Sequence, residues 1–437
     1  MNRRSGRSVR VAICLAILVV TAAACVAGQT ASSRSGTQSP TLPSASSFGP
    51  TPSADGPGVS PLPSEQPRTS ASPAPDPSRF PDPAGGIRAH ALGKLTGNWV
   101  FVGKQVPYPH NIWAEIQIWA IPLDTGTPRL AFAYDVSLGG IPEAIFDNAP
   151  YLRRQFSPEG TRMVVSVGGQ LMVVDLTTGQ VRALGVSGFF PAWSKDGSRI
   201  AFVFFLPAGQ VSVPEEAIGV VRADGGPVTD IAHVGFSRQT VEWSPDGSMV
   251  IVAQADGIAL VDASNGRLIR HLTAVASNGS SFAYWRGATP QIAAATGGCD
   301  AAQITMVIGL DDATTPERTL LDTGEHCPTL SIQDPRWNPV TANELVYVAT
   351  RAAPGTMPSE FRVHLLDTGS GRDTTLGLSA YEATWTWDGA AIAYVAKSAT
   401  GFYGDSVRIW RRDGSGERVL LTDTQDPSFF SIASLSY

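Results

Sequence analysis

The sequence predicts an all-β chain whose short antiparallel sheets close into a ring. Two repeated phrases and the two chain ends predict it. The first phrase is an aromatic residue, a tight polar turn and an apolar strand, as in Trp243–Gly247 followed by Met249–Ala253. Proline presets φ and glycine accepts positive φ, so this turn reverses the chain between two strands. Six copies, one of them degenerate, begin at Phe156, Trp193, Trp243, Trp285, Trp337 and Trp385.

The second phrase is a strand that ends at an aspartate, followed by a short polar turn that usually holds glycine and then by another strand. Aspartate bonds its own backbone and glycine supplies positive φ, which suits a hairpin. Copies recur about 40 to 55 residues apart, the length of four short strands, which is typical of one blade of a β-propeller. The seven aspartates are Asp124, Asp175, Asp224, Asp262, Asp311, Asp367 and Asp413.

The two ends of the chain explain why seven copies of the second phrase accompany only six copies of the first. The segment Asn98–Val102 has the pattern of a second strand without a first, and Phe429–Leu435 that of a first strand without a second. Pairing them completes one more blade and leaves no open seam in the ring. We therefore predict a seven-bladed β-propeller over residues 88–437, with a six-bladed ring as the alternative.

The repeated phrases resemble those of a known family. Trp193–Gly197 reads W-S-x-D-G and Trp243–Gly247 reads W-S-P-D-G, as in the WD40-like repeats of the TolB-type β-propeller family. The resemblance covers about residues 90–437, and it implies the propeller fold.

Residues 1–28 have the pattern of a targeting segment. Arginines precede an apolar run, Val11–Ala27, whose length fits a signal sequence. Ala22–Cys25 resembles a lipobox, so we expect lipidation of Cys25 and a lipoprotein on the outer face of the cell membrane. Secretion after simple cleavage and an uncleaved transmembrane anchor are the alternatives.

Residues 29–87 are rich in Ser, Thr, Pro, Gly and Ala. Such a composition cannot bury enough apolar surface to offset the entropy of ordering, so we expect a disordered linker.

Two cysteines, Cys299 and Cys327, lie in the predicted propeller. Cys299 follows the second predicted strand of a blade and Cys327 the fourth, so both emerge on one face. In an oxidising compartment an even pair favours a disulfide, and two separate buried thiols are the alternative.

The net charge and the absence of common motifs exclude several classes of function. A formal charge of −6 without a basic stripe argues against nucleic acid and against adsorption to an anionic membrane, so membrane contact is expected only through the N-terminal anchor. No common catalytic or nucleotide-binding motif occurs. The six histidines are scattered, so we expect no metal and no cofactor.

The longest and most variable connections fall on the face that carries the second-to-third strand turns and the loops between blades. Variable loops on a rigid frame are common binding sites. Aromatic and acidic residues in these loops form a candidate binding rim, and the alternative is that the aromatics only pin their own loops. The rim residues are Tyr108, His110, Trp113, Glu215, Glu216, Phe402 and Tyr403.

We therefore expect a monomeric, non-enzymatic envelope protein that presents this loop face to a protein, peptide or glycan. The alternative is a hydrolase or lyase that acts on envelope glycan or peptide in the propeller pore through paired carboxylates. The innermost predicted strands offer Arg153, Arg154, Glu242 and Glu382 for such chemistry.

Overall fold

In the computed structural model, the described residues all belong to one compact unit. The predicted signal segment lies outside the described residues. Cys25, Cys299, Cys327 and most of the predicted linker also lie outside the described residues. The described ranges are 86–107, 113–137, 152–206, 216–234, 240–254, 257–272, 281–285, 291–296, 303–308, 318–323, 330–352, 359–397, 404–422 and 429–436.

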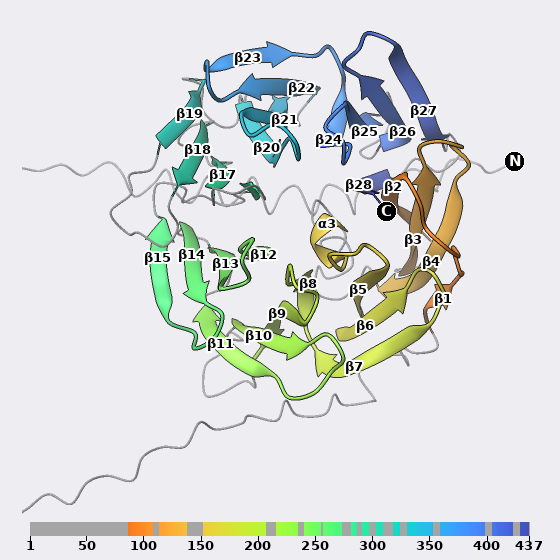
Figure 1. The fold of residues 1–437 in the computed structure, drawn as a ribbon, viewed down its shortest axis with the longest axis vertical. Coiled ribbons are helices and arrows are strands. Elements are labelled where there is room, and N and C mark those ends of the chain that lie inside the picture. Colours follow the sequence, from red (N-terminus) through yellow and green to blue (C-terminus); the bar gives the residue numbers. More distant parts are fainter. Residues whose placement is uncertain are drawn as a thin grey trace, which may run out of the picture. The chain divides into compact units, whose positions relative to one another are not determined.

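Within these ranges the strands pair antiparallel into six sheets that stand around a central axis (Figure 1). The arrangement is a β-propeller, as the sequence predicts. Four of the sheets hold four strands each, in chain order from the axis outward. Their strands are β8 (Phe189–Trp193), β9 (Arg199–Phe205), β10 (Glu216–Arg222) and β11 (Thr229–Val234); β12 (Thr240–Trp243), β13 (Met249–Gln254), β14 (Gly257–Asp262) and β15 (Leu268–Leu272); β16 (Ser281–Trp285), β17 (Gln291–Thr296), β18 (Gln303–Ile308) and β19 (Arg318–Asp322); and β20 (Leu330–Trp337), β21 (Glu344–Arg351), β22 (Glu360–Asp367) and β23 (Arg372–Thr375).

The fifth sheet has nine strands and comprises two successive four-strand units. One unit is β24 (Ala380–Trp385), β25 (Ala391–Lys397), β26 (Gly404–Arg411) and β27 (Gly416–Thr422). The other is β28 (Phe429–Ser436), β2 (Asn98–Pro107), β3 (Trp113–Pro122) and β4 (Arg129–Ser137), with β1 (Arg88–Ala89) at its outer edge. The two units join at the pair Gly404–Phe429. The count of six sheets matches the six-bladed alternative, and these sheets hold seven repeat units because the nine-stranded sheet comprises two of them.

The predicted closure is confirmed. The last strand, β28, pairs antiparallel with β2, from Asn98 opposite Ser436 to Lys104 opposite Phe429. The two ends of the described chain therefore share one sheet.

The three-stranded sheet differs from the sequence prediction at its inner edge. It holds β5 (Arg162–Val167), β6 (Gln170–Asp175) and β7 (Val181–Ser187). An innermost strand was expected to carry Arg153 and Arg154, but these residues lie in a one-turn helix, α3 (Leu152–Gln155). Strand pairing is reduced to the isolated bridge between Phe156 and Met163. Leu152 of the helix and Phe156, which follows it, are buried in the core.

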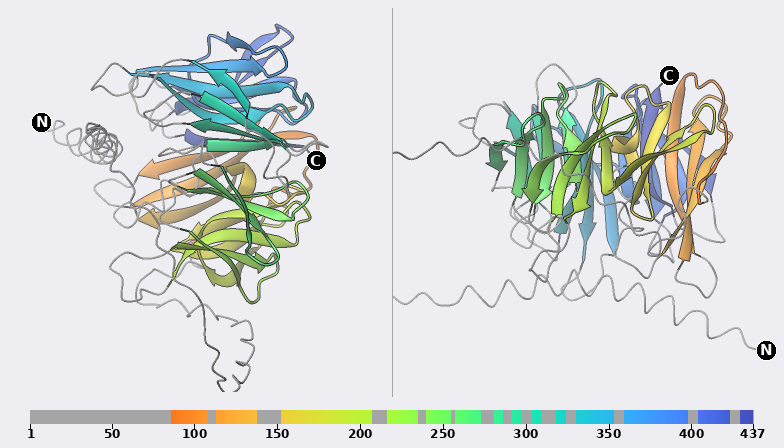
Figure 2. Two further views of the ribbon diagram at one scale, coloured as in Figure 1. Left: turned by 90° about the vertical axis from the view of Figure 1, so that its left-hand side faces the viewer. Right: turned by 90° about the horizontal axis from the view of Figure 1, so that it is seen from below.

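The hydrophobic core consists of layers between neighbouring sheets. Alternate residues of a strand face opposite sides of its sheet. In β13, Val250 and Val252 pack against the preceding sheet, whereas Ile251 packs toward the following one. Because both faces are covered, the central residues of the second strands are apolar, as in Val250–Val252 of β13. The strands run between the two faces of the ring (Figure 2).

The repeated turns follow the predicted chemistry. After β8 and β12 the amide of glycine, at Gly197 and Gly247, donates to the carbonyl of the serine three residues earlier, and both glycines have φ of 72°. In the second phrase, the Asp175 carboxylate accepts from the amides of Thr177 and Thr178, both at 2.9 Å. The carboxylates of Asp262, Asp367 and Asp413 accept from turn amides in the same way, so these four aspartates act in turn formation.

Candidate functional site

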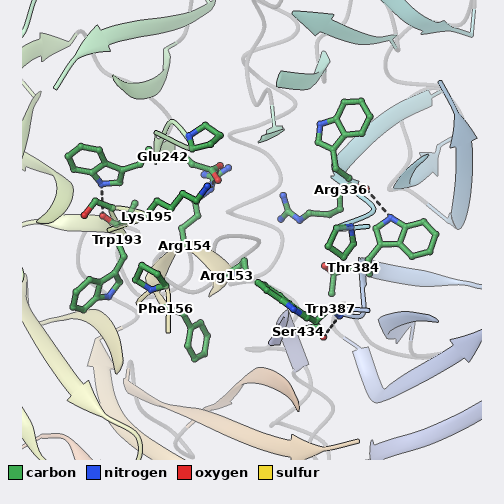
Figure 3. A pocket seen from close by; sticks show the side chains of 18 of the residues that line it. Arg153, Arg154, Phe156, Trp193, Lys195, Glu242, Arg336, Thr384, Trp387 and Ser434 are labelled. Atoms are coloured by element: carbon green, nitrogen blue, oxygen red, sulfur yellow. Dashed lines mark hydrogen bonds and ion pairs between the residues drawn. The ribbon is translucent and has the colours of Figure 1, made fainter. Parts of the chain in front are cut away.

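A pocket of about 500 Å³ lies at the centre of the ring (Figure 3). It is lined by the ends of β8, β12, β20 and β24, by the turns that follow them, by α3 and by β28. All four turns connect a first strand to a second strand, so the pocket lies toward the face with the short regular turns. We call it the central pocket.

Four tryptophans that end innermost strands form the wall of the pocket, and we call them the anchor tryptophans. They are Trp193, Trp243, Trp337 and Trp385, with 3% to 7% of their surface exposed. The indole N–H of Trp243 donates to the carbonyl of Ala192 at 3.0 Å, and that of Trp385 to the carbonyl of Arg336 at 3.2 Å. Each acceptor directly precedes the anchor tryptophan of the neighbouring unit. The wall is therefore fixed by hydrogen bonds between units.

Arginines cover three of the anchor rings. The guanidinium of Arg162 lies 4.8 Å from the ring centre of Trp193, and that of Arg199 lies 4.6 Å from Trp243. Arg412, which follows β26 of the same unit, lies 5.5 Å from the ring centre of Trp385. In the other two cases the arginine comes from the preceding unit. Such cation–π contacts stabilise the junction between units. The buried anchors therefore have a structural role.

Trp387 differs from the anchors because 41% of its surface is exposed. It lies in the turn after β24, and its amide donates to Ser434 Oγ of β28 at 3.1 Å. The guanidinium of Arg153 in α3 lies 5.3 Å from its ring centre. The turn after β24 thus carries an exposed indole at the pocket, with contacts to β28 and α3 (Figure 3).

The charged residues of the described lining are mostly basic. They are Arg153 and Arg154 of α3, Lys195 in the turn after β8, Arg336 of β20, and Glu242 of β12. Arg154 Nε lies 2.8 Å from Glu242 Oε2, and these two side chains are 6% and 10% exposed. A buried pair of this kind ties α3 to β12, the innermost strand of its sheet.

The turn beside Lys195 is held by a short hydrogen-bond network. The Ser194 hydroxyl donates to the Asp196 carboxylate at 2.6 Å, and Ser194 Oγ accepts from the Arg199 amide at 2.9 Å. The hydroxyls of Ser194 and then Ser198 lower the pKa of Asp196 from 3.8 to about 2. The carboxylate is therefore ionised at neutral pH, and it fixes the turn that carries Lys195.

Most of the predicted site residues lie outside the described residues. Trp113 begins β3 opposite Ser137, and Glu216 begins β10 with 5% of its surface exposed. The other rim residues lie outside, namely Tyr108, His110, Glu215, Phe402 and Tyr403. The predicted rim and the disulfide stay predictions.

Three of the four residues named for the pore, Arg153, Arg154 and Glu242, do line the central pocket, and the fourth, Glu382, is buried in β24. The sequence reading missed Lys195, Arg336 and Trp387. For Lys195 and Trp387 the sequence does contain a signal, because each departs from the repeated phrase. Lys195 replaces the proline of Trp243–Gly247, and Trp387 is a second aromatic residue inside its repeat.

A second pocket, of about 230 Å³, lies beside β21, β22 and β23. His364 Nδ1 lies 2.9 Å from Asp373 Oδ2, and the ring of His364 stacks on Tyr347 with 4.9 Å between centres. Burial, followed by the nearby Asp373 carboxylate, raises the pKa of Tyr347. This cluster joins three strands of one sheet, so its polar groups are used within the fold.

No family model and no curated protein matches the chain. Solved structures that resemble it include TolB from Acinetobacter baumannii, with 15% identity, 77% of this chain and 82% of that chain covered and a TM-score of 0.42. A putative TolB from Agrobacterium tumefaciens has 14% identity, covers 79% and 99%, and has a TM-score of 0.36. An oligogalacturonate lyase from Vibrio parahaemolyticus has 10% identity, covers 78% and 85%, and has a TM-score of 0.35. Likenesses at these identities concern the fold alone.

The part of the chain that the structure describes contains no group of three or more His, Cys, Asp or Glu residues placed to hold a metal ion. Among the same residues, no helix has the length and apolar character needed to cross a membrane.

Proposed function

We propose that this chain is a non-enzymatic β-propeller that binds a partner in the cell envelope through its central pocket. The observation that carries the proposal is the exposed Trp387 at a preformed pocket of about 500 Å³. Ligand sites are concave and largely preformed, with aromatic walls and few polar groups. Exposed tryptophans held by surrounding structure are frequent binding anchors.

The cell-envelope location in this proposal is inferred from the sequence. The predicted signal segment and Cys25 support a location outside the cytoplasm, where proteins, peptides and glycans are the available partners. The predicted loop rim on the opposite face stays a second candidate surface.

The lining favours binding over hydrolysis by paired carboxylates. Such hydrolysis of glycosides needs two carboxyl groups about 5 to 9.5 Å apart. The described lining supplies one carboxylate, Glu242, which is paired with Arg154. A lyase that uses a basic residue is the remaining enzymatic alternative, and the experiment includes its readout.

The test is a binding array of envelope peptides and glycans with the purified exported chain and two variants. Trp387→Ala removes the exposed indole, and Val419→Ala, at an exposed position of β27 outside the pocket, is the matched control. We expect the hits to weaken by roughly tenfold or more with Trp387→Ala and to stay unchanged with Val419→Ala. Hits that survive Trp387→Ala would overturn the central pocket as the site. Cleavage of a hit by the wild-type chain would establish the enzymatic alternative.

A further inference from the structure

We infer that the partner enters the central pocket with an acidic peptide segment, in which carboxylates alternate with apolar side chains. This inference rests on the proposed function and adds the chemistry of its ligand. Three features of the pocket carry it: the sign of its charge, the place of its cations and the apolar character of its mouth.

The sign of the charge is opposite to that of the chain. The whole sequence has a formal charge of −6, whereas the described lining has four basic residues and one acidic residue. Glu242 is paired with Arg154 at 2.8 Å, and the described lining has three more basic side chains than acidic ones. A cleft with low-dielectric walls and charges of one sign focuses the field and attracts the opposite charge.

The cations surround the pocket from several elements. Arg153 comes from α3, Lys195 from the turn after β8 and Arg336 from β20 (Figure 3). Guanidinium groups bind carboxylates in a planar, two-pronged geometry, and an exposed lysine adds a mobile point charge. Lys195 is exposed, and its turn is fixed by Ser194 and Asp196. A ligand with more than one carboxylate therefore meets basic side chains from three elements.

The mouth of the pocket is apolar, which favours a peptide over an acidic glycan. Val340 is 66% exposed and Trp387 is 41% exposed, and both line the pocket. Pro158, Pro245 and Pro339 complete this surface. A peptide offers apolar side chains to such a mouth, whereas the hydroxyl groups of a uronic-acid glycan need polar partners that accept hydrogen bonds.

The experiment measures binding of fluorescein-labelled ten-residue peptides to the purified exported chain by anisotropy. One peptide alternates glutamate with leucine and phenylalanine, a second has glutamine at every glutamate, and a third has lysine there. A uronic-acid oligosaccharide with the same number of carboxylates is the glycan arm. Lys195→Glu tests the pocket, and Lys94→Glu, an exposed lysine outside the lining, makes the same charge change.

We expect the acidic peptide to bind more tightly than the glutamine and lysine peptides, and its affinity to fall as salt is raised. Lys195→Glu should weaken it by roughly tenfold and Lys94→Glu should leave it unchanged. Equal binding of the glutamine peptide, lost with Trp387→Ala, would overturn the acidic ligand and keep the proposed pocket. Tighter binding of the oligosaccharide would overturn the peptide. Binding of the acidic peptide that neither Trp387→Ala nor Lys195→Glu changes would overturn both.

Discussion

The Arg154–Glu242 pair is the residue-scale feature that holds α3 at the central pocket. Both side chains are nearly inaccessible, and they come from α3 and β12, which belong to different units. α3 has one turn, so its position depends on such contacts and on buried Leu152. Arg153, its neighbour in α3, is thereby placed over Trp387.

Removing one partner of this pair should cost far more stability than removing both. Glu242→Leu leaves the Arg154 guanidinium buried beside an apolar group, and such losses are about 3 to 5 kcal/mol. Arg154→Met combined with Glu242→Leu should recover a large part of that loss. Urea unfolding followed by tryptophan fluorescence measures both. The exposed pair Arg222–Asp224 is the control, and Asp224→Ala should leave the free energy of unfolding nearly unchanged. A Glu242→Leu variant as stable as Asp224→Ala would contradict the structural role of the pair.

At the scale of the element, the repeated turn is the unit that the sequence predicted best. β12 ends at Trp243, β13 begins at Met249, and the serine and aspartate of the turn bond as their types require. Such turns are local, so five or six residues determine them. α3 was missed because it replaces a strand only through its burial between neighbouring units, which no local pattern contains.

The turn chemistry gives a pH prediction. The pKa of Asp196 is about 2 in the folded chain, below its ordinary value of 3.8, so protonation favours unfolding. The contribution of this carboxylate is complete above about pH 4 and is lost as the pH falls toward about 2. Asp196→Asn should therefore melt below the wild type at pH 7, and the difference in melting temperature should shrink between about pH 4 and pH 2. Thermal unfolding across that range measures it. A difference that stays constant with pH would show that the charge of Asp196 contributes nothing to stability.

At the scale of the whole molecule, the site depends on residues that break the repeat. The ring could be predicted because its repeats carry the same anchors and hairpins, and its closure followed from two incomplete ends. The central pocket could be predicted only in part. Arg153, Arg154 and Glu242 were expected near the axis, but Lys195 and Trp387 lie in turns that sequence reasoning treated as uniform connections. Their convergence from separate units is a property of the closed ring.

Closure itself gives the last prediction. β28 pairs with β2 over nearly its whole length, joins β26 at Gly404–Phe429 and supplies Ser434 to Trp387. Deleting residues 429–436 leaves the edges of two units unpaired and removes the buried side chains of Ile432, Ala433 and Leu435 from the core. An unpaired inner edge also offers itself to other chains. We therefore expect a fall of at least several degrees in the melting temperature, together with association of the truncated chain in size-exclusion chromatography.

Deletion of residues 1–89 is the matched control, because it removes the other terminal strand, β1, from the outer edge of the same sheet. β1 pairs through two residues only, Arg88 and Ala89, so its loss leaves the closure intact and should shift the melting temperature much less. The contrast depends on where in the sheet each terminal strand pairs. If both truncations melt alike, the ring holds together through the packing of its units, and the pairing of β28 with β2 contributes little to its stability.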